Sequence, residues 1–180
     1  MSTHTVTQLL RNAQHVVVFT GAGASAESGI PTFRDALSGL WERFDPAQLA
    51  TPEAFRADPS LCWGWYEWRR QKVGQAQPNG AHLAIAELAR HVPRLTVVTQ
   101  NVDDLHERAG SQGVIHLHGS LNSPRCIDCG HSYQLPESLE DLPEEGSRIE
   151  PPRCRACDGC SGLLIPDTDL GENPRRERGV

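Results

Sequence analysis

An apolar run that ends in a turn of small residues constrains the fold of this chain most strongly. Residues 16–19 (VVVF) contain no polar residue, as is typical of a strand covered on both faces in a parallel sheet. Gly21 and Gly23 follow, among alanines and a serine. Because these glycines lack Cβ atoms, the backbone can turn sharply and a ligand can approach it closely. The stretch predicts a β-strand that leads through a ligand-binding loop into a helix.

The spacing of these small residues fits a dinucleotide-binding turn. Gly21-x-Gly23-x-x-Ala26 matches the fingerprint in which N–H groups at a helix N-terminus bind a pyrophosphate. Such folds place an acidic residue about 20 positions further on to bind the ribose, and Asp45 is the candidate, although it precedes Pro46 in an expected loop. An ordinary tight turn explains the same residues, so the loop alone leaves both interpretations open.

Further strands and helices are expected to alternate along the chain. Helices are predicted over residues 5–14 and 79–91, and buried strands over residues 94–101 and 113–120. The apolar residues of the second helix that should face the core are Leu83, Ala86 and Leu88. This alternation favours right-handed crossovers and a parallel sheet, so the predicted fold class is α/β.

Residues 35–75 are expected to form a helical insertion in this sheet domain. Prolines interrupt its first part, which favours short helices there. Residues 61–73 predict a longer helix in which Trp65 and Trp68 are partly buried, and Cys62 is expected to be a core residue.

The cysteines of the C-terminal part have the spacing of a zinc site. Cys126 and Cys129 form one Cys-x-x-Cys pair, and Cys154 and Cys157 form another. Two such pairs favour a zinc ribbon, a structural site because four thiolates leave no coordination position open for a substrate. Cys160 offers a competing pair with Cys157, and we favour Cys154 with Cys157. Disulfides are the less favoured alternative, since no secretion signal opens the chain.

Composition and charge exclude several classes of protein. The 180 residues are 38% hydrophobic and 22% charged, which is typical of a folded globular chain. A formal net charge of -6 gives no reason to expect nucleic acid as a partner. No apolar run approaches the length of a membrane span, so we expect a cytoplasmic protein without membrane contact.

Polar residues follow both later strands at one expected edge of the sheet. Gln100, Asn101 and Asp103 follow the second strand, and His116 and His118 lie in the third. Ligands bind at this edge in α/β proteins, so these side chains should lie near the Gly-rich loop. An amide and a carboxylate can hold the carboxamide of nicotinamide, and a histidine can act as general base. Taken singly, Asn101 and Asp103 are also suitable helix caps, and His116 a satisfied core residue.

Several motifs together resemble those of the sirtuins, the NAD-dependent protein-lysine deacylases. They are GAGASAESGIPTFR, TQNVDDLH, HLHGSL and the paired Cys-x-x-Cys, within about residues 5–160. The resemblance implies a Rossmann-like, doubly wound parallel sheet, incomplete in this chain, with a small zinc-ribbon module. It also implies one structural Zn²⁺, and NAD that is consumed as a co-substrate and not used as a hydride carrier.

The resemblance also implies roles for individual residues. Those expected to bind NAD are Gly21, Ala22, Gly23, Ala24, Ser25, Phe33, Arg34, Gln100, Asn101 and Asp103. The loop through Ser25 would hold the pyrophosphate, and Gln100 would contact a ribose. Asn101 with Asp103 would hold the nicotinamide amide, and His118 would be the catalytic base.

The implied reaction moves an acyl group from lysine to ADP-ribose. The carbonyl oxygen of an acyl-lysine attacks C1′ of the nicotinamide ribose, and nicotinamide leaves. His118 then helps to deprotonate a ribose hydroxyl, which attacks the imidate carbon, and water completes the transfer. The implied partners are acyl-lysine proteins, and the sequence indicates no particular oligomeric state.

Tyr66 and Arg69 refine the acyl group that the resemblance implies. They lie at i and i+3 of the predicted helix and match the Tyr-x-x-Arg of the sirtuins that remove succinyl and malonyl groups as well as acetyl groups. An arginine fork pairs well with a carboxylate inside an apolar acyl tunnel. The alternative is a surface arginine like its neighbour Arg70.

The chain departs from the family pattern after Gly159. We expect residues 1–121 to be the N-terminal part of the NAD-binding domain, residues 122–165 the zinc module and residues 166–180 an atypical tail. The family's aromatic substrate-binding strand has no counterpart in this tail. Two functions stay open: a working deacylase, or an inactive fragment that keeps zinc and part of the NAD binding. A dehydrogenase would explain neither the cysteine pairs nor Tyr-x-x-Arg.

Overall fold

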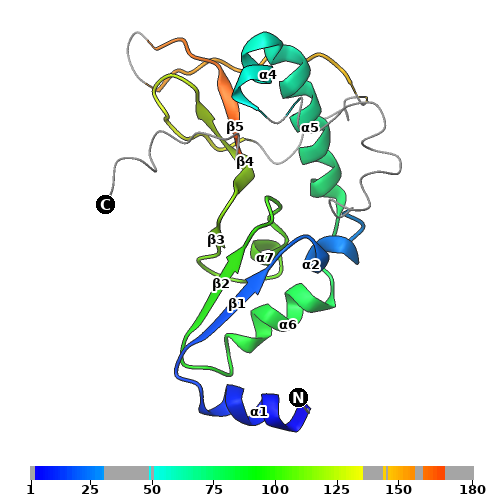
Figure 1. Ribbon diagram of the computed structural model, residues 1–180, viewed down its shortest axis with the longest axis vertical. Helices are drawn as coiled ribbons and strands as arrows, with labels where there is room; N and C mark the ends of the chain where they lie inside the picture. The colour runs from blue at the N-terminus through cyan, green and yellow to red at the C-terminus, as the bar shows by residue number, and fades with distance from the viewer. Residues whose placement is uncertain are drawn as a thin grey trace. The chain divides into compact units, whose positions relative to one another are not determined.

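The computed structural model describes most of the chain, namely residues 3–30, 49, 51–135, 144, 146–156 and 160–168. The chain divides into two compact units, and each is described by itself (Figure 1). The first unit contains Met1–Thr32 and Ala76–Leu117, and the second contains Phe33–Gln75 and His118–Val180. The expected helical insertion thus shares a unit with the cysteine-rich part of the chain.

The first unit is built on a parallel sheet with the strand order β1-β2-β3. β1 (Val16–Thr20) pairs along its whole length with β2 (Leu95–Thr99), and β2 pairs with β3 (Ile115–His116). The predicted α/β fold with a parallel sheet is confirmed. The third strand, predicted over residues 113–120, is shorter than expected because the chain from Gly119 onward pairs in the sheet of the second unit.

The helices described in this unit are α1 (Thr3–Asn12), α2 (Gly23–Ala26), α6 (Gly80–Leu88) and α7 (Leu105–Arg108). The strand-to-helix turn after β1 therefore leads into a helix, as the sequence predicts. α6 is shorter than the predicted 79–91. Asn79 is its N-cap, and the Asn79 side chain accepts a hydrogen bond from the backbone N–H of Ala81.

His82, and not Leu83, is the residue of α6 that faces the core. The His82 ring accepts a hydrogen bond from the backbone N–H of Asn79 and completes a capping box, so this side of the helix lies inward. His82 is fully buried, whereas Leu83 is 54% exposed and Ala86 and Leu88 are half-buried. The prediction that Leu83 faces inward is wrong, because capping overrides apolar periodicity in so short a helix.

One face of the parallel sheet carries exposed apolar side chains. Val17 and Phe19 of β1 are 57% and 60% exposed, and Ile115 of β3 is 48% exposed. Alternate residues of a strand point to opposite faces, so the half-buried Val16 and Val18 lie on the other face. The sequence predicts cover on both faces of β1, and the described residues provide it on one face only.

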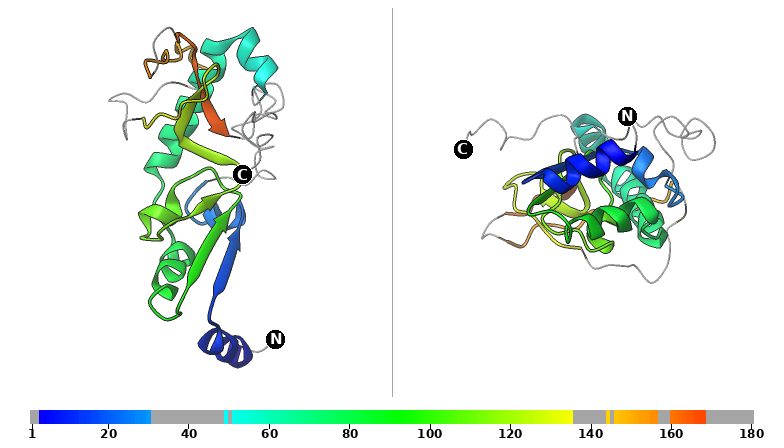
Figure 2. Two further views of the ribbon diagram at one scale, coloured as in Figure 1. Left: turned by 90° about the vertical axis from the view of Figure 1, so that its left-hand side faces the viewer. Right: turned by 90° about the horizontal axis from the view of Figure 1, so that it is seen from below.

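The second unit combines helices with an antiparallel sheet. α4 (Pro52–Ala57) and α5 (Pro59–Gln75) come before β4 (Gly119–Cys126), which pairs with β5 (Leu164–Thr168). Figure 2 shows these two strands side by side, and α5 contacts both of them. Within the described ranges, no helix is long and apolar enough to span a membrane.

α5 is buried on nearly all sides over its middle turns. Trp65, Trp68 and Cys62 are only 1%, 7% and 1% exposed, which confirms the predicted helix and its core residues. Arg70 is buried too, and its Nη2 lies 2.8 Å from the Glu67 carboxylate. The description of Arg70 as a surface residue is therefore wrong, because an intrahelical ion pair allows its burial.

Candidate functional site

The Gly-rich loop links the end of β1 to α2 without using left-handed backbone at its first glycines. The glycines with positive φ lie elsewhere, at the turns that end α2 and α7 among other places. A Cβ on Gly21 would lie 3.3 Å from Oε1 of Gln100, and a Cβ on Gly23 would meet no atom within 4 Å. The space beside Gly23 is open, which is compatible with the close approach of a ligand; that a ligand binds this loop stays a prediction.

Three polar side chains meet beside this loop inside the first unit. Ser25 Oγ donates a hydrogen bond to Asp103 Oδ2 over 2.9 Å, and Asn101 Nδ2 donates one to Ser25 Oγ over 2.9 Å. All three residues are buried, at 1% exposed for Ser25, 8% for Asn101 and 6% for Asp103. The structure thus brings together residues predicted from the first and the second strand end.

Asp103 also caps the helix that follows. Its Oδ1 accepts a hydrogen bond of 3.2 Å from the backbone N–H of Leu105, whereas the side chain of Asp104, the N-cap of α7, makes no capping hydrogen bond. The capping interpretation therefore holds for one carboxylate oxygen of Asp103. The other oxygen accepts the hydrogen bond from the Ser25 hydroxyl, so each carboxylate oxygen of Asp103 has a donor.

His116 is a satisfied residue, as the alternative interpretation predicts. Its Nδ1 lies 2.9 Å from the carbonyl oxygen of Asn101, and its Nε2 lies 2.7 Å from Oε1 of Glu107. The hydrogen bond with Glu107 raises the pKa of His116 above its ordinary value. The ring links β3 to the backbone of Asn101 and so helps to position the Asn101 side chain.

Of the remaining predicted NAD ligands, the structure describes Gln100 but not Phe33 or Arg34. Gln100 is exposed, and its backbone N–H donates a 3.0 Å hydrogen bond to the carbonyl of Thr20, which ties it to the start of the loop. Phe33, Arg34 and the candidate ribose ligand Asp45 lie outside the described residues.

His118 belongs to the second unit and is exposed, one residue before β4 begins. The next residue, Gly119, has a φ of 76°, and a Cβ there would overlap the carbonyl oxygen of Asp167. Only glycine fits this position, because both the backbone conformation and the close approach of β5 exclude a side chain. This turn fixes the backbone directly after His118.

Tyr66 and Arg69 lie on α5 in the same unit. The Tyr66 hydroxyl accepts a 3.0 Å hydrogen bond from Thr168 Oγ1, and burial raises the pKa of this phenol. The Arg69 guanidinium lies over the ring of Trp65, 4.7 Å from its centroid. Burial lowers the pKa of Arg69, while the nearby Tyr66 acts in the opposite direction. The arginine is thus held against an aromatic wall beside a buried phenol.

Four cysteines converge at the end of the antiparallel sheet. The Sγ atoms of Cys126, Cys129, Cys154 and Cys160 all lie within 4.8 Å of one another. Two of the Sγ–Sγ distances are 3.6 Å, between Cys126 and Cys160 and between Cys129 and Cys154. Four thiolates at about 2.3 Å from a tetrahedral zinc lie about 3.8 Å apart, so these residues fit the metal.

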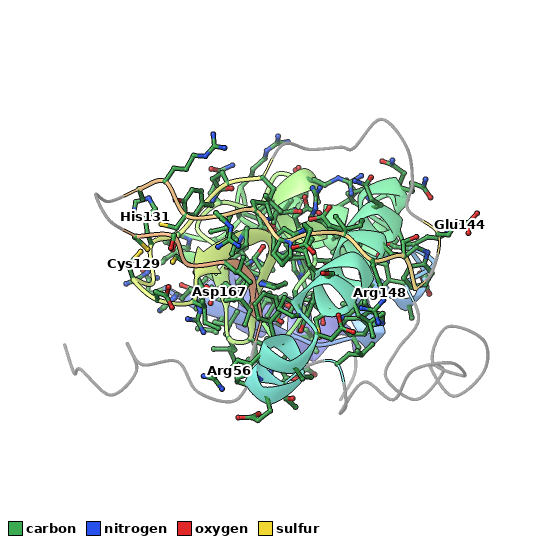
Figure 3. The ribbon with its side chains drawn as sticks, turned by 90° about the horizontal axis from the view of Figure 1, so that it is seen from above. Arg56, Cys129, His131, Glu144, Arg148 and Asp167 are labelled. Atoms are coloured by element: carbon green, nitrogen blue, oxygen red, sulfur yellow. The ribbon has the colours of Figure 1, made fainter. Side chains whose placement is uncertain are left out.

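Close backbone packing brings the first two of these cysteines into position. The backbone N–H of Cys129 donates to Cys126 Sγ over 3.5 Å, across a turn that ends at Gly130 with a φ of 69°. A Cβ on Gly162 would lie 2.7 Å from Cys126 Sγ and 2.5 Å from Asp128 Oδ2. A side chain at residue 162 would therefore displace Asp128 and the Cys126 thiol where the chain approaches this turn. Figure 3 shows Cys129 and His131 near each other at the edge of the unit.

Tyr133 supports the cluster and is missed by sequence reasoning. Its hydroxyl donates to Cys154 Sγ over 3.1 Å and accepts a 2.7 Å hydrogen bond from the backbone N–H of Arg155. Hydrogen bonds lower the pKa of Cys154 to about 6, the one from Tyr133 first and the one from the backbone of Ala156 next, which favours the thiolate. No spacing rule points to this tyrosine, because its contact depends on how the two halves of the cysteine module pack.

The structure tests the favoured second pair, Cys154 with Cys157, only at Cys154, which lies in the cluster. Cys157, expected as a ligand, lies outside the described residues. Cys160, expected to be dispensable, lies within the cluster. The backbone N–H of Cys154 donates a 2.8 Å hydrogen bond to the carbonyl of Gly162, which holds the segment next to Cys160 close to Cys154. With Cys160 present, the described residues already supply four thiols.

Comparisons with known proteins agree with this arrangement. The model of the Sir2 family matches residues 21–177. The "NAD-dependent protein deacylase 1" of Pseudomonas aeruginosa is 65% identical over 156 residues, which are 86% of this chain and 62% of that protein. A crystal structure of a Sir2 homologue–NAD complex superimposes with a TM-score of 0.76 at 48% identity, over 92% of this chain and 60% of the other. A structure described as Sir2 bound to acetylated peptide gives a TM-score of 0.69 at 30% identity, over 96% and 66%.

The chain spans about three fifths of the length of these relatives, as the shares of 62% and 60% show. The matched family model nevertheless covers most of the chain, from the Gly-rich loop to beyond β5. It includes both the polar residues beside the loop and the cysteine cluster. The chain belongs to the Sir2 family.

Proposed function

We propose that this chain carries the NAD-binding loop and the zinc module of an NAD-dependent protein-lysine deacylase. The observation that carries the proposal is the buried hydrogen-bonded chain Asn101–Ser25–Asp103, beside a loop whose backbone is open at Gly23. An amide and a carboxylate held at a strand end suit the carboxamide of nicotinamide. The similarity to a Sir2 homologue in complex with NAD supports NAD as the ligand.

The residues around the loop have separate tasks in this proposal. Residues 21–25 bind the pyrophosphate through their backbone N–H groups at the start of α2, and Gln100 contacts a ribose. Asp103 and Asn101 orient the nicotinamide amide, and burial keeps water from competing for these groups. Phe33 and Arg34 complete the cofactor site on the strength of the family resemblance.

His118 is the proposed general base. NAD, when bound, supplies the ADP-ribose that accepts the acyl group as nicotinamide leaves. His118 takes a proton from a ribose hydroxyl, so that this oxygen can attack the carbon of the acyl group. The substrates are acyl-lysine proteins, as the acetylated peptide bound to another Sir2 protein supports.

The proposed zinc ligands are Cys126, Cys129, Cys154 and Cys160, because these are the thiols that the structure brings together. A zinc ion with four thiolates has no open position, so its task is to hold the loops of the second unit and not to act on substrate. A cytoplasmic location belongs to the same proposal, since thiols in such pairs persist where the environment is reducing.

Tyr66 and Arg69 are proposed to recognise an acidic acyl group, succinyl or malonyl. The Arg69 guanidinium is held against Trp65, and a carboxylate in so apolar a place gains more from an arginine than it would in water. The Tyr66 hydroxyl keeps its own proton for donation while it accepts the hydrogen bond from Thr168. Replacement of both residues should therefore affect acidic acyl groups more than acetyl groups.

The test follows nicotinamide release from NAD with acetyl-lysine and succinyl-lysine peptides, using mass spectrometry. The Y66F/R69M double variant should lose about ten- to a hundredfold in desuccinylation while deacetylation persists, since a charge-assisted hydrogen bond contributes about 1.5–3 kcal/mol. H118A should abolish both reactions. Equal loss on both peptides would show that Tyr66 and Arg69 serve packing, and NAD binding without any turnover would support the inactive fragment.

A further inference from the structure

Two buried histidines lie behind the Gly-rich loop and take no part in the function proposed so far. His82 of α6 and His106 of α7 are 0% and 1% exposed. Their ring centroids are 4.8 Å apart, and the ring planes meet edge to face at 64°. Two fully buried titratable side chains require an explanation, because leucine or phenylalanine would fill the same space without polar atoms.

His106 contacts the residue with which the loop begins. Its Nε2 lies 2.9 Å from the hydroxyl of Thr20, the last residue of β1 and the neighbour of Gly21. The backbone carbonyl of Thr20 accepts the hydrogen bond from Gln100 N. The hydroxyl and the carbonyl of Thr20 are therefore both held, one by α7 and one by the end of β2.

His82 acts on the other end of the loop through Asn79. The backbone N–H of Asn79 donates to His82 Nδ1 over 3.3 Å. The Asn79 side-chain amide then donates to the carbonyl of Ala24 over 2.8 Å and to Ser28 Oγ over 3.0 Å. Asn79 therefore joins α6 both to α2 and to the residues that follow α2. The hydrogen bond to His82 holds Asn79 in place.

Burial disfavours the charged form of both rings in the folded chain. Burial lowers the pKa of each, and for His106 the neighbouring His82 lowers it further. His82 Nε2 and His106 Nδ1 are buried without a hydrogen-bond partner among the described residues. Such partly satisfied groups destabilise a core, so their presence favours a role that an apolar residue cannot fill.

We propose that His82 and His106 form a positioning pair that holds both ends of the segment from Thr20 to Ser28 in the geometry needed for cofactor binding. That this segment receives NAD rests on the proposed function; that the pair positions the segment rests on the hydrogen bonds of Thr20 and Asn79. Neither histidine touches the cofactor in this proposal, so neither is a catalytic residue.

The test separates the hydrogen bonds of the rings from their bulk. H106L and H82L remove the bonds and keep apolar volume. H106Q places an amide nitrogen near the position of Nε2, and H82N places an oxygen near the position of Nδ1, so both should restore the contact. T20V removes the other partner of His106 and should resemble H106L without adding to it. H91L, on an exposed histidine just after α6, is the control.

Hydrogen exchange of the backbone amides from Gly21 to Gly29 is measured on the full chain without cofactor, and NAD affinity by calorimetry. The leucine variants and T20V should exchange this segment about tenfold faster and bind NAD about tenfold more weakly, the effect of one lost hydrogen bond. H106Q, H82N and H91L should stay near wild type in both measurements.

Unchanged exchange of this segment in T20V and the leucine variants, or equal effects of the leucine and amide variants, would overturn the proposal. If a leucine variant does not fold, T20V and H106Q still decide the outcome, because both keep the core filled. A wild-type chain that does not bind NAD would count against the proposed function, whereas the exchange measurement would still decide the role of the pair.

Discussion

The hydroxyl of Ser25 donates a 2.9 Å hydrogen bond to the carboxylate of Asp103, 78 residues further along the chain. This bond joins the helix that follows the Gly-rich loop to the segment between β2 and α7, and both partners are buried. It connects the part of the site expected to bind pyrophosphate with the part expected to bind nicotinamide. The geometry of one therefore depends on the other.

Replacement of Ser25 by alanine should destabilise the first unit. The change leaves Asp103 Oδ2 and Asn101 Nδ2 in the core without the hydroxyl that joins them, and a buried group left unpaired costs about 1–3 kcal/mol. Hydrogen exchange of the β2 amides should report this loss as faster exchange. S161A, at an exposed serine of the second unit, is the matched control and should change nothing. Equal protection of β2 in both variants would mean that the bond has no energetic weight.

The choice between Cys157 and Cys160 can be decided by metal content. Purified protein should contain about one zinc per chain, and C160S should lose it because three thiolates hold the metal less well than four. C157S should keep it, and the measurement is elemental analysis after dialysis against a weak chelator. Zinc that is retained in C160S and lost in C157S would restore the pair that the sequence first favoured.

Tyr133 offers a finer test of the same module. Y133F removes the hydroxyl that donates to Cys154 and accepts from Arg155, and leaves the ring in place. Groups that hydrogen-bond to metal ligands typically contribute about 10- to 100-fold in metal affinity, so zinc should be lost to a chelator about tenfold more readily. Y66F removes a hydroxyl elsewhere in the unit and serves as the control for zinc retention. If both variants lose zinc to the chelator equally readily, the Tyr133 hydroxyl does not contribute to zinc affinity and Tyr133 contributes only packing.

The sequence predicts the parallel sheet and the convergence of polar residues beside the loop for a local reason. Apolar runs that end in small or polar residues report where strands end, and strand ends of a parallel sheet meet at one edge. The contact of Asn101 and Asp103 with Ser25 follows from that rule. It needs no knowledge of how the helices pack.

Other features depend on tertiary contacts and could not be read from periodicity. The apolar pattern of α6 predicts that Leu83 faces the core. The capping contact of His82 with Asn79 instead determines which side of the helix lies inward. Arg70 looks like a surface residue in the sequence, and its ion pair with Glu67 allows it to be buried. Cys160 lies in the cluster near a backbone hydrogen bond from the N–H of Cys154 to the carbonyl of Gly162. Each outcome depends on a partner whose position only the folded chain defines.

The buried histidine pair should make the first unit sensitive to mild acid. His82 and His106 have lowered pKa values in the folded chain, mainly because burial disfavours the charged rings. In the unfolded chain both histidines have the ordinary pKa of about 6.5 and bind protons that the folded chain does not bind. The free energy of unfolding therefore falls as the pH drops below about 6.5. The nearby Asp103 opposes this shift at both rings, and at His106 Glu107 opposes it while His116 adds to it.

His116 contributes the opposite pH dependence in the same unit. Its pKa is raised by Glu107, so its stabilising effect is full below about pH 6.5 and is lost as the pH rises through the folded value. The H82N/H106Q double variant removes the acid-sensitive groups and keeps His116. Between about pH 6.5 and about pH 5, wild type should therefore lose stability more steeply than the double variant, by on the order of 1 kcal/mol per pH unit for each histidine.

The measurement must report on the first unit alone. The tryptophans all lie between residues 41 and 68 and so belong to the second unit, which makes their fluorescence unsuitable. Hydrogen exchange of the β1 and β2 amides, corrected for the intrinsic rate at each pH, gives the opening free energy of the parallel sheet directly. H91N, at an exposed histidine, should retain the wild-type pH dependence. If the double variant and wild type lose protection in parallel on acidification, the two buried rings do not take up protons on unfolding and the acid sensitivity has another source.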